Sequence, residues 1–270
     1  MSSEGSQNAS RVKRFKARLA AGETVIGAWL TIPDLSVAEI MASSGFDYVI
    51  IDAEHAPWTV GEIQVALSGF RGSDTVLLVR VPWNDAVAVK HVLDAGIDGV
   101  VCPMVRTVEE ARSLVAACRY PPAGTRGFGP RRASDYYRRA REYAAAANAE
   151  IVIVPQIEDA RFLHEVDGIL ALDGVDAICL GPADFSGSLG RLLDWAHPEV
   201  AAALDTVLAK AKAKGVAVCT GIVVPPDAVP EWAAKGARMP LVAADTGLLT
   251  DGAAALLRET RKRLAPKESR

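Results

Sequence analysis

Short apolar runs alternate with amphipathic segments along most of the chain. The runs contain few polar positions, as expected of parallel strands that are covered on both faces. Eight candidate strands follow from this pattern: residues 25–30, 48–51, 76–81, 99–101, 151–156, 177–180, 216–220 and 239–243.

Several of the intervening segments carry helix boundaries: residues 34–42, 85–94, 107–118, 198–214 and 227–235. Asp34 and Asp85 are typical N-caps, and Thr107 with Glu110 forms a capping box. Repeated strand–helix units predict an α/β fold, a (β/α)8 TIM barrel. The rival fold is an open doubly wound sheet, but the Gly-rich first turn typical of that fold is absent.

Two segments exceed the repeat. Residues 11–21 are expected to form a helix before the first strand that covers the bottom of the barrel. Residues 120–148 form a long excursion that ends in a helix, and we expect it at the catalytic end, where long loops are functional or interfacial. The last helix, 248–264, is expected to pack on its own barrel or on a neighbour. We therefore expect a disordered tail (1–10), one domain (11–265) and a short C-terminal tail (266–270).

Composition narrows the class of protein. The 270 residues are 50% hydrophobic, which suits one barrel domain of about 250 residues. The net charge of −3 gives no sign of nucleic acid binding. The arginines between 126 and 141 are interrupted by acidic and aromatic residues, which favours a solvated or interface helix.

The cysteines and the N-terminal residues indicate the cellular compartment of the protein. The four cysteines contain no CxxC pair and are expected to be buried thiols in a reducing compartment. We find neither a signal peptide nor a run of about 20 apolar residues. These observations predict a cytoplasmic protein without a membrane partner.

Two carboxylates follow neighbouring candidate strands. Glu158 ends the motif Gln-Ile-Glu, and Asp184 lies in Gly-Pro-Ala-Asp. Because all strand carboxyl ends of a parallel barrel share one face, both acids are expected at the catalytic face. Oxygen ligands of this kind suit a hard divalent cation. The alternatives stay open: Glu158 as a first-turn helix acid and Asp184 as an ordinary turn or N-cap residue.

Other strand ends add a cation, an imidazole and an indole. Arg80 ends an apolar run, so its charge must meet an anion or water in the barrel mouth. Asp52 is expected either to bind metal or to cap a turn, and His55 either to act chemically or to be a solvated loop residue. Trp29 is interpreted as pocket wall. Asp94, near a helix end, is by its position an ordinary solvated acid.

The ordered set of short motifs resembles the HpcH/HpaI aldolase family of class II, metal-dependent pyruvate aldolases. The motifs are IDAEHAP (51–57), VRVPWND (79–85), RYPPAGTRG (119–127), QIE (156–158) and GPAD (181–184). The resemblance runs from about residue 15 to the last helix.

The resemblance implies a ligand set and a cofactor. Glu158 and Asp184 would bind a divalent metal (Mg²⁺, Mn²⁺ or Co²⁺), with no organic cofactor. Arg80 would contact the pyruvate oxygen.

It also implies the remaining roles. His55 would work with Asp94, and the backbone amides of Ala183 and Asp184 would hold the pyruvate carboxylate. Gln156 and Trp29 complete the expected substrate-binding residues.

The implied activity is reversible, metal-dependent aldol cleavage of 4-hydroxy-2-oxoacids to pyruvate and an aldehyde through a metal-stabilised enolate. The implied assembly is a homo-hexamer, a trimer of dimers with the last helix exchanged. Two alternatives remain: a citrate-lyase-like lyase of CoA thioesters, and a non-catalytic barrel that binds metal and oxoacid. A Schiff-base aldolase is disfavoured because every lysine falls on a helical or terminal segment.

Overall fold

Eight parallel strands close into a barrel in the computed structural model, which describes residues 10–264. Each strand pairs with the next along the chain, and the last pairs with the first. The strands are β1 (Gly27–Leu30), β2 (Tyr48–Asp52), β3 (Val76–Arg80), β4 (Gly99–Cys102), β5 (Val152–Ile157), β6 (Ala177–Leu180), β7 (Ala217–Val223) and β8 (Met239–Ala244). The predicted (β/α)8 barrel is confirmed. The two predicted tails lie outside the described residues, except for Ser10.

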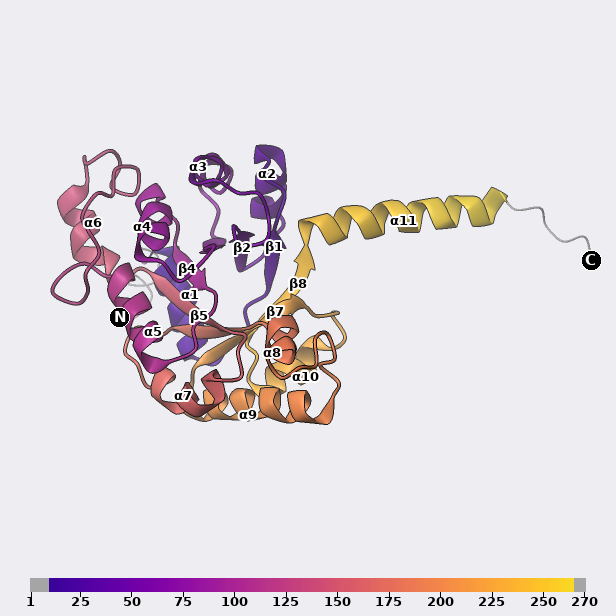
Figure 1. Cartoon of the computed structure of the whole chain (residues 1–270). Coiled ribbons are helices and arrows are strands. Elements are labelled where there is room, and N and C mark those ends of the chain that lie inside the picture. Colours follow the sequence, from indigo (N-terminus) through magenta and orange to yellow (C-terminus); the bar gives the residue numbers. More distant parts are fainter. Residues whose placement is uncertain (1–9, 265–270) are drawn as a thin grey trace, which may run out of the picture.

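The described residues also form helices before, between and after the strands, as Figure 1 shows. They are α1 (Arg11–Ala20), α2 (Leu35–Ser43), α3 (Val60–Gly69), α4 (Ala86–Ala95), α5 (Val108–Cys118), α6 (Ala140–Ala147), α7 (Phe162–Ile169), α8 (Pro182–Ser188), α9 (Pro198–Lys214), α10 (Val229–Lys235) and α11 (Asp245–Leu264). The N-caps Asp34 and Asp85 and the capping box of Thr107 are confirmed. Among residues 10–264, no helix combines the length and apolarity needed to span a bilayer.

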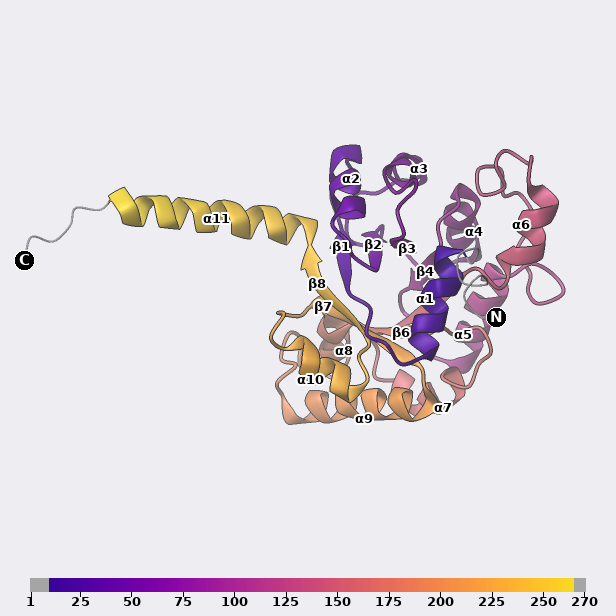
Figure 2. The same cartoon turned by 180° about the vertical axis from the view of Figure 1, so that it is seen from behind.

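Helix α1 closes the amino end of the barrel, as predicted. Its basic residues pair with acids that directly precede strands: Arg11 with Asp98, Lys16 with Asp176, and Arg18 with Asp47. Its apolar face, including Phe15, packs against side chains inside the barrel. Figure 2 shows α1 across this end. Arg80 and Glu158, at the ends of β3 and β5, lie at the opposite end of the barrel.

Two apolar layers hold the fold together. One fills the barrel, and the other lies between the strands and the surrounding helices. Alternate residues of β2 divide between the layers, with Ile50 inside and Ile51 outside. All four cysteines are buried free thiols, as expected.

The expected position of the long excursion is wrong. Helix α5 follows β4 directly, so residues 119–151 connect the end of α5 to the start of β5. They lie at the amino end of the strands. Arg132 there donates to the carbonyl of Ala95 at 2.9 Å, at the end of α4. Strand–helix order, not loop length, decides which face a loop occupies.

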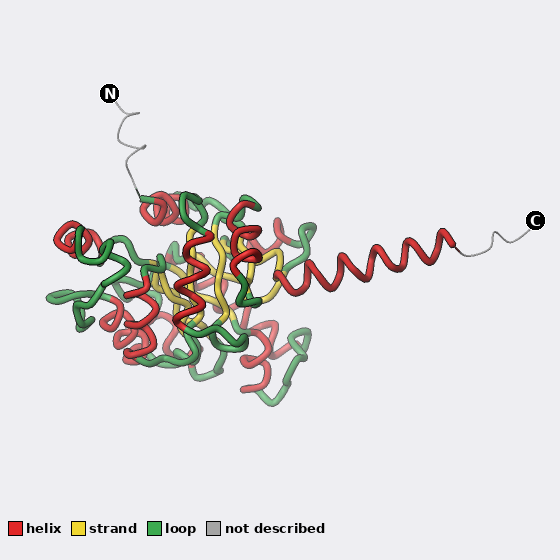
Figure 3. The backbone as a smooth tube through the Cα atoms, turned by 90° about the horizontal axis from the view of Figure 1, so that it is seen from above, coloured by secondary structure: helices red, strands yellow, loops and turns green. Residues whose placement is uncertain are grey.

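Helix α11 does not pack along its own barrel. It begins directly after β8, and Asp245 is its one buried residue. Figures 1 and 3 show the rest of the helix projecting away from the molecule. Of the two predicted arrangements, packing on the same barrel is excluded.

Candidate active site

A two-point ion pair joins the ends of β2 and β3. Asp52 and Arg80 are register partners on these strands. Arg80 donates from Nε to Oδ1 of Asp52 at 2.9 Å and from Nη2 to Oδ2 at 2.7 Å. Asp52 also accepts the backbone N–H groups of Glu54 and His55, each at 3.2 Å. Asp52 thus caps the turn after β2 and fixes the guanidinium.

The pair is buried and charged. Burial alone would lower the pKa of the Arg80 guanidinium, but hydrogen bonds to Asp52 offset this and the pKa lies above its usual value. Burial likewise opposes ionisation of Asp52, yet Arg80 and the two backbone donors hold its pKa below the usual value. Both groups therefore remain ionised at neutral pH.

Glu54 is a functional candidate to which the sequence assigned no role. Its Oε2 lies 3.2 Å from Nε of Arg80 and 3.7 Å from Nε2 of His55. That oxygen is buried and has no hydrogen bond within the described chain. Burial raises the pKa of Glu54 to about 7; Arg80 opposes the rise, and Glu158 adds to it. Its place in the same turn as Asp52 and His55 was the available signal.

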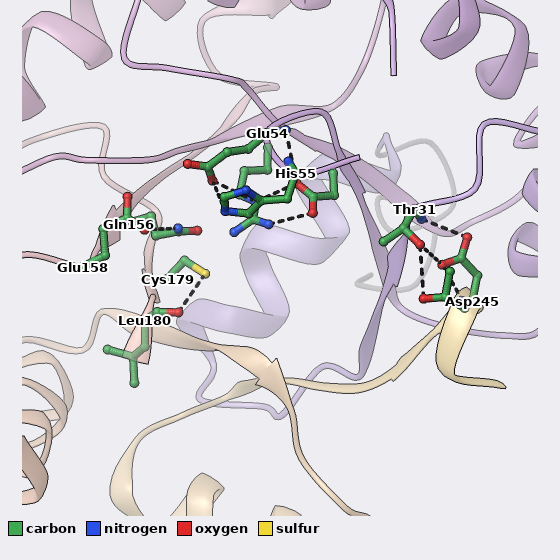
Figure 4. A network of polar contacts seen from close by, with 11 residues as sticks. Thr31, Glu54, His55, Gln156, Glu158, Cys179, Leu180 and Asp245 are labelled. Atoms are coloured by element: carbon green, nitrogen blue, oxygen red, sulfur yellow. Dashed lines mark hydrogen bonds and ion pairs between the residues drawn. The ribbon is translucent and has the colours of Figure 1, made fainter. Parts of the chain in front are cut away.

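Glu158 is held from two directions just after β5. Its Oε1 accepts the backbone N–H of Met104, and its Oε2 accepts Nε2 of Gln156 at 2.5 Å. Gln156 Oε1 is buried without a partner in the described residues. Figure 4 shows Gln156 and Glu158 across the site from Glu54 and His55. The two acids face a common space, so the Gln-Ile-Glu motif provides an oriented carboxylate.

Gly181 makes room for that carboxylate. A Cβ at this position would lie 2.7 Å from Cβ of Glu158 and 2.9 Å from its Oε2. The residues that follow form α8, which carries Asp184 in its first turn. The side chain of Asp184 is exposed towards solvent. The Gly-Pro-Ala-Asp motif thus has two roles: its glycine leaves space for the side chain of Glu158, and its last residue is Asp184 itself.

The donor set fits a hard divalent cation. Burial raises the pKa of Glu158, with Gln156 and Met104 opposing the rise and the charge of Asp184 adding to it. Negative charges gathered in this way are stabilised by a cation between them. Within residues 10–264 no group of three or more His, Cys, Asp or Glu side chains could hold a metal ion. Two carboxylates with water and substrate in the other positions remain the fitting arrangement.

Trp29 and His55 occupy the mouth as expected from their positions. The Cζ of Arg80 lies 4.5 Å from the centre of the Trp29 ring, which is almost fully buried. Trp29 is therefore a wall that supports the guanidinium. The side chain of His55 is 62% exposed, which leaves it free to meet a substrate.

Asp94 is not brought to His55 within one chain. It lies in the last turn of α4, at the amino end of the barrel, whereas His55 follows β2 at the carboxyl end. There its Oδ1 accepts from Nη2 of Arg126 at 2.7 Å, and the Arg126 side chain is only 2% exposed. Inside one chain the imidazole neighbours Glu54 instead. Arg126 is thus committed to Asp94.

Comparison with known proteins agrees with this geometry. Residues 25–252 match the model of the HpcH/HpaI aldolase/citrate lyase family. A hydroxypyruvate/pyruvate aldolase of Roseobacter denitrificans is 38% identical over 238 residues, 87% of this chain and 92% of the relative. A 4-hydroxy-2-oxo-heptane-1,7-dioate aldolase of Salmonella typhimurium is 38% identical over 244 residues, 90% and 92% of the two chains.

A solved structure gives the same result. A HpcH/HpaI aldolase/citrate lyase family protein from Burkholderia cenocepacia superposes with a TM-score of 0.86 and 34% identity, over 92% of this chain and 99% of that one. The barrel and its acidic mouth define a carbon–carbon lyase. The chain belongs to the HpcH/HpaI aldolase/citrate lyase family, as its motifs indicated.

Proposed function

We propose that the protein catalyses reversible, divalent-metal-dependent aldol cleavage of 4-hydroxy-2-oxoacids to pyruvate and an aldehyde. The observation that carries this is the convergence of Arg80 with Glu158 and Asp184 at the carboxyl ends of β3, β5 and β6. The names of the two curated relatives support a pyruvate product.

Glu158 and Asp184 would hold the metal, which as a Lewis acid favours negative charge on the keto oxygen of the substrate. Arg80 faces that charge with a fixed cation. Its Nε and Nη2 are engaged by Asp52, which leaves Nη1 for a substrate oxygen. A preorganised donor of this kind is worth about 3–4 kcal/mol of transition-state stabilisation. First-turn N–H groups of α8, at Ala183 and Asp184, lack intrahelical acceptors and suit the substrate carboxylate.

His55 handles the proton. Cleavage requires loss of the proton from the C4 hydroxyl, rupture of the C3–C4 bond and later protonation of C3. The exposed imidazole can take the hydroxyl proton directly or through one water. Oε2 of Glu54 lies 3.7 Å from Nε2 of the imidazole and is its neighbour in the chain. The proton is then available to return to the pyruvate carbanion.

The test is a coupled assay of pyruvate release over a panel of 4-hydroxy-2-oxoacids, with and without EDTA. Chelation should abolish turnover, and Mg²⁺, Mn²⁺ or Co²⁺ should restore it. Glu158→Gln should require far more metal than wild type. Full activity in excess EDTA, or borohydride trapping of pyruvate on a lysine, would contradict the proposal. Cleavage of a CoA thioester in place of any hydroxy-oxoacid would assign the citrate-lyase-like activity instead.

We also propose a cytoplasmic homo-oligomer, a hexamer built as a trimer of dimers, in which α11 is exchanged between subunits. Helix α11 exposes five leucines: Leu248, Leu249, Leu256, Leu257 and Leu264. A projecting helix that exposes this many leucines is not expected to persist alone in water. Light scattering should give a hexamer for the full chain and smaller species for Leu256→Glu/Leu257→Glu. A wild-type monomer would contradict the assembly.

A further inference from the structure

Met104 has a backbone conformation that its residue type disfavours. Its φ is +57°, in the left-handed region that glycine and asparagine adopt readily. The other described non-glycine residues with positive φ lie on exposed loops: Asp135, Tyr136, Tyr137 and Leu193. Met104 alone among them lies in the barrel mouth, directly after β4, and is partly buried.

The residues around Met104 fix this conformation. Pro103 and Val105 on either side are both buried, and Val105 belongs to the core between strands and helices. The segment is too short to rearrange freely, because α5 begins at Val108. The chain therefore turns through its left-handed residue between two anchored neighbours.

The consequence of the turn is the direction of one backbone donor. The N–H of Met104 donates to Oε1 of Glu158, opposite the bond from Gln156 to Oε2. With both oxygens held, the carboxylate has one orientation. A backbone flip at residue 104 would withdraw the N–H and leave Glu158 tethered through Gln156 alone. Strained residues persist where the surrounding structure requires them, and they cluster at functional sites.

We propose that Met104 is a positioning residue: its left-handed backbone aims an N–H at Glu158 and thereby orients that carboxylate for the divalent cation. This inference rests on the metal role of Glu158 in the proposed function. The important property of residue 104 is its ability to adopt positive φ, not its side chain. Hydrogen-bond partners of metal ligands typically change metal affinity about 10- to 100-fold when lost.

The experiment measures Mn²⁺ binding by titration calorimetry on the full chain, independently of turnover. Met104→Gly and Met104→Asn tolerate the left-handed conformation and keep the N–H, so each should bind Mn²⁺ within about threefold of wild type. Met104→Val introduces a β-branched residue that disfavours positive φ, and its affinity should fall about 10- to 100-fold. Met104→Ala should fall between glycine and valine and serves if the valine variant does not fold. Melting temperatures of the metal-free proteins report folding.

Two results would overturn the inference. Wild-type affinity in both the valine and alanine variants would show that the N–H is not needed. Equal losses in the glycine, asparagine and valine variants would show that the methionine side chain matters instead. Glu158→Gln separates this from the proposed function, because unchanged Mn²⁺ binding in that variant would refute the metal assignment itself.

Discussion

Asp52 accepts hydrogen bonds from Arg80 at both carboxylate oxygens, from Nε to Oδ1 at 2.9 Å and from Nη2 to Oδ2 at 2.7 Å. The two residues are register partners at the ends of adjacent strands, so the barrel itself sets their separation. Trp29 stacks beneath the guanidinium. The position and the plane of the Arg80 guanidinium are thereby fixed, and one edge of the guanidinium is directed away from Asp52.

Arg80→Lys should not preserve activity. A lysine retains the charge but cannot make two parallel hydrogen bonds to Asp52 while presenting a further donor to the substrate. We expect kcat to fall on the order of 10²-fold, as for loss of an oxyanion donor. Steady-state kinetics at saturating Mn²⁺ provide the measurement, with Arg112→Lys at an exposed position of α5 as the control. A lysine variant within a few-fold of wild type would make Arg80 a structural charge.

His55→Ala should separate two partial reactions. If His55 moves the proton of the substrate hydroxyl, retro-aldol cleavage should fall roughly 10²- to 10⁴-fold. Exchange of the pyruvate methyl protons with deuterium should fall less, because enolisation depends mainly on the metal and Arg80. Both rates can be followed by NMR in the same preparation. Equal losses would mean that His55 also serves enolisation or holds the site together.

The strand ends were predictable because the barrel imposes them. Once eight apolar runs are placed, any polar residue after a run must lie at the mouth, which located Arg80, Glu158 and Asp184. By the same rule residues 120–148 belong at the other end of the barrel, because they follow helix α5 and precede strand β5. Helix α3 carries a capping box of Thr59 and Glu62 that the predicted boundaries omit, whereas helix α7 has no side-chain N-cap.

Contacts between residues that are far apart in the sequence were harder to predict. Nothing in the sequence joins Asp94 to Arg126, 32 positions later, and the resemblance directed Asp94 to His55 instead. Glu54 gave no signal beyond its place in a motif, because its contact with Arg80 depends on the turn that Asp52 caps. The positive φ of Met104 has no sequence signature at all, since methionine rarely adopts it. Such features depend on tertiary constraint rather than on local preference.

Glu54→Gln should change how stability depends on pH. Burial raises the pKa of Glu54 from its ordinary 4.5 to about 7. The folded protein therefore binds more protons than the unfolded chain in this window, so stability falls as pH rises from about 4.5 to 7. The loss is on the order of 2–3 kcal/mol, and it should vanish in the glutamine variant.

Melting temperatures of the metal-free proteins at pH 5 and pH 8 supply the measurement. The difference in melting temperature between Glu54→Gln and wild type should favour the variant more at pH 8 than at pH 5. Glu62→Gln, on an exposed capping box of α3, is the control for a general effect of charge. Parallel curves for wild type and Glu54→Gln would show that Glu54 titrates near its ordinary pKa.

Substrates whose aldehyde half carries a phosphate should be poor. In barrels of this kind the phosphate usually lies against the loops after the seventh and eighth strands. Here residues 224–228 include two prolines, which lack N–H donors, and an aspartate rather than a basic residue. After β8, Asp245 accepts from the N–H groups of Thr31 and Ile32 at 2.9 and 2.7 Å, which adds negative charge at that position. Arg126 cannot supply the missing positive charge within the chain, because it is buried against Asp94 at the far end of the barrel.

We therefore expect kcat/KM for an uncharged or carboxylate-bearing 4-hydroxy-2-oxoacid to exceed that of its phosphorylated counterpart. A clear preference for the phosphorylated compound would require an anion site outside the single chain, and variants of the exposed arginines between 131 and 141 would then locate it.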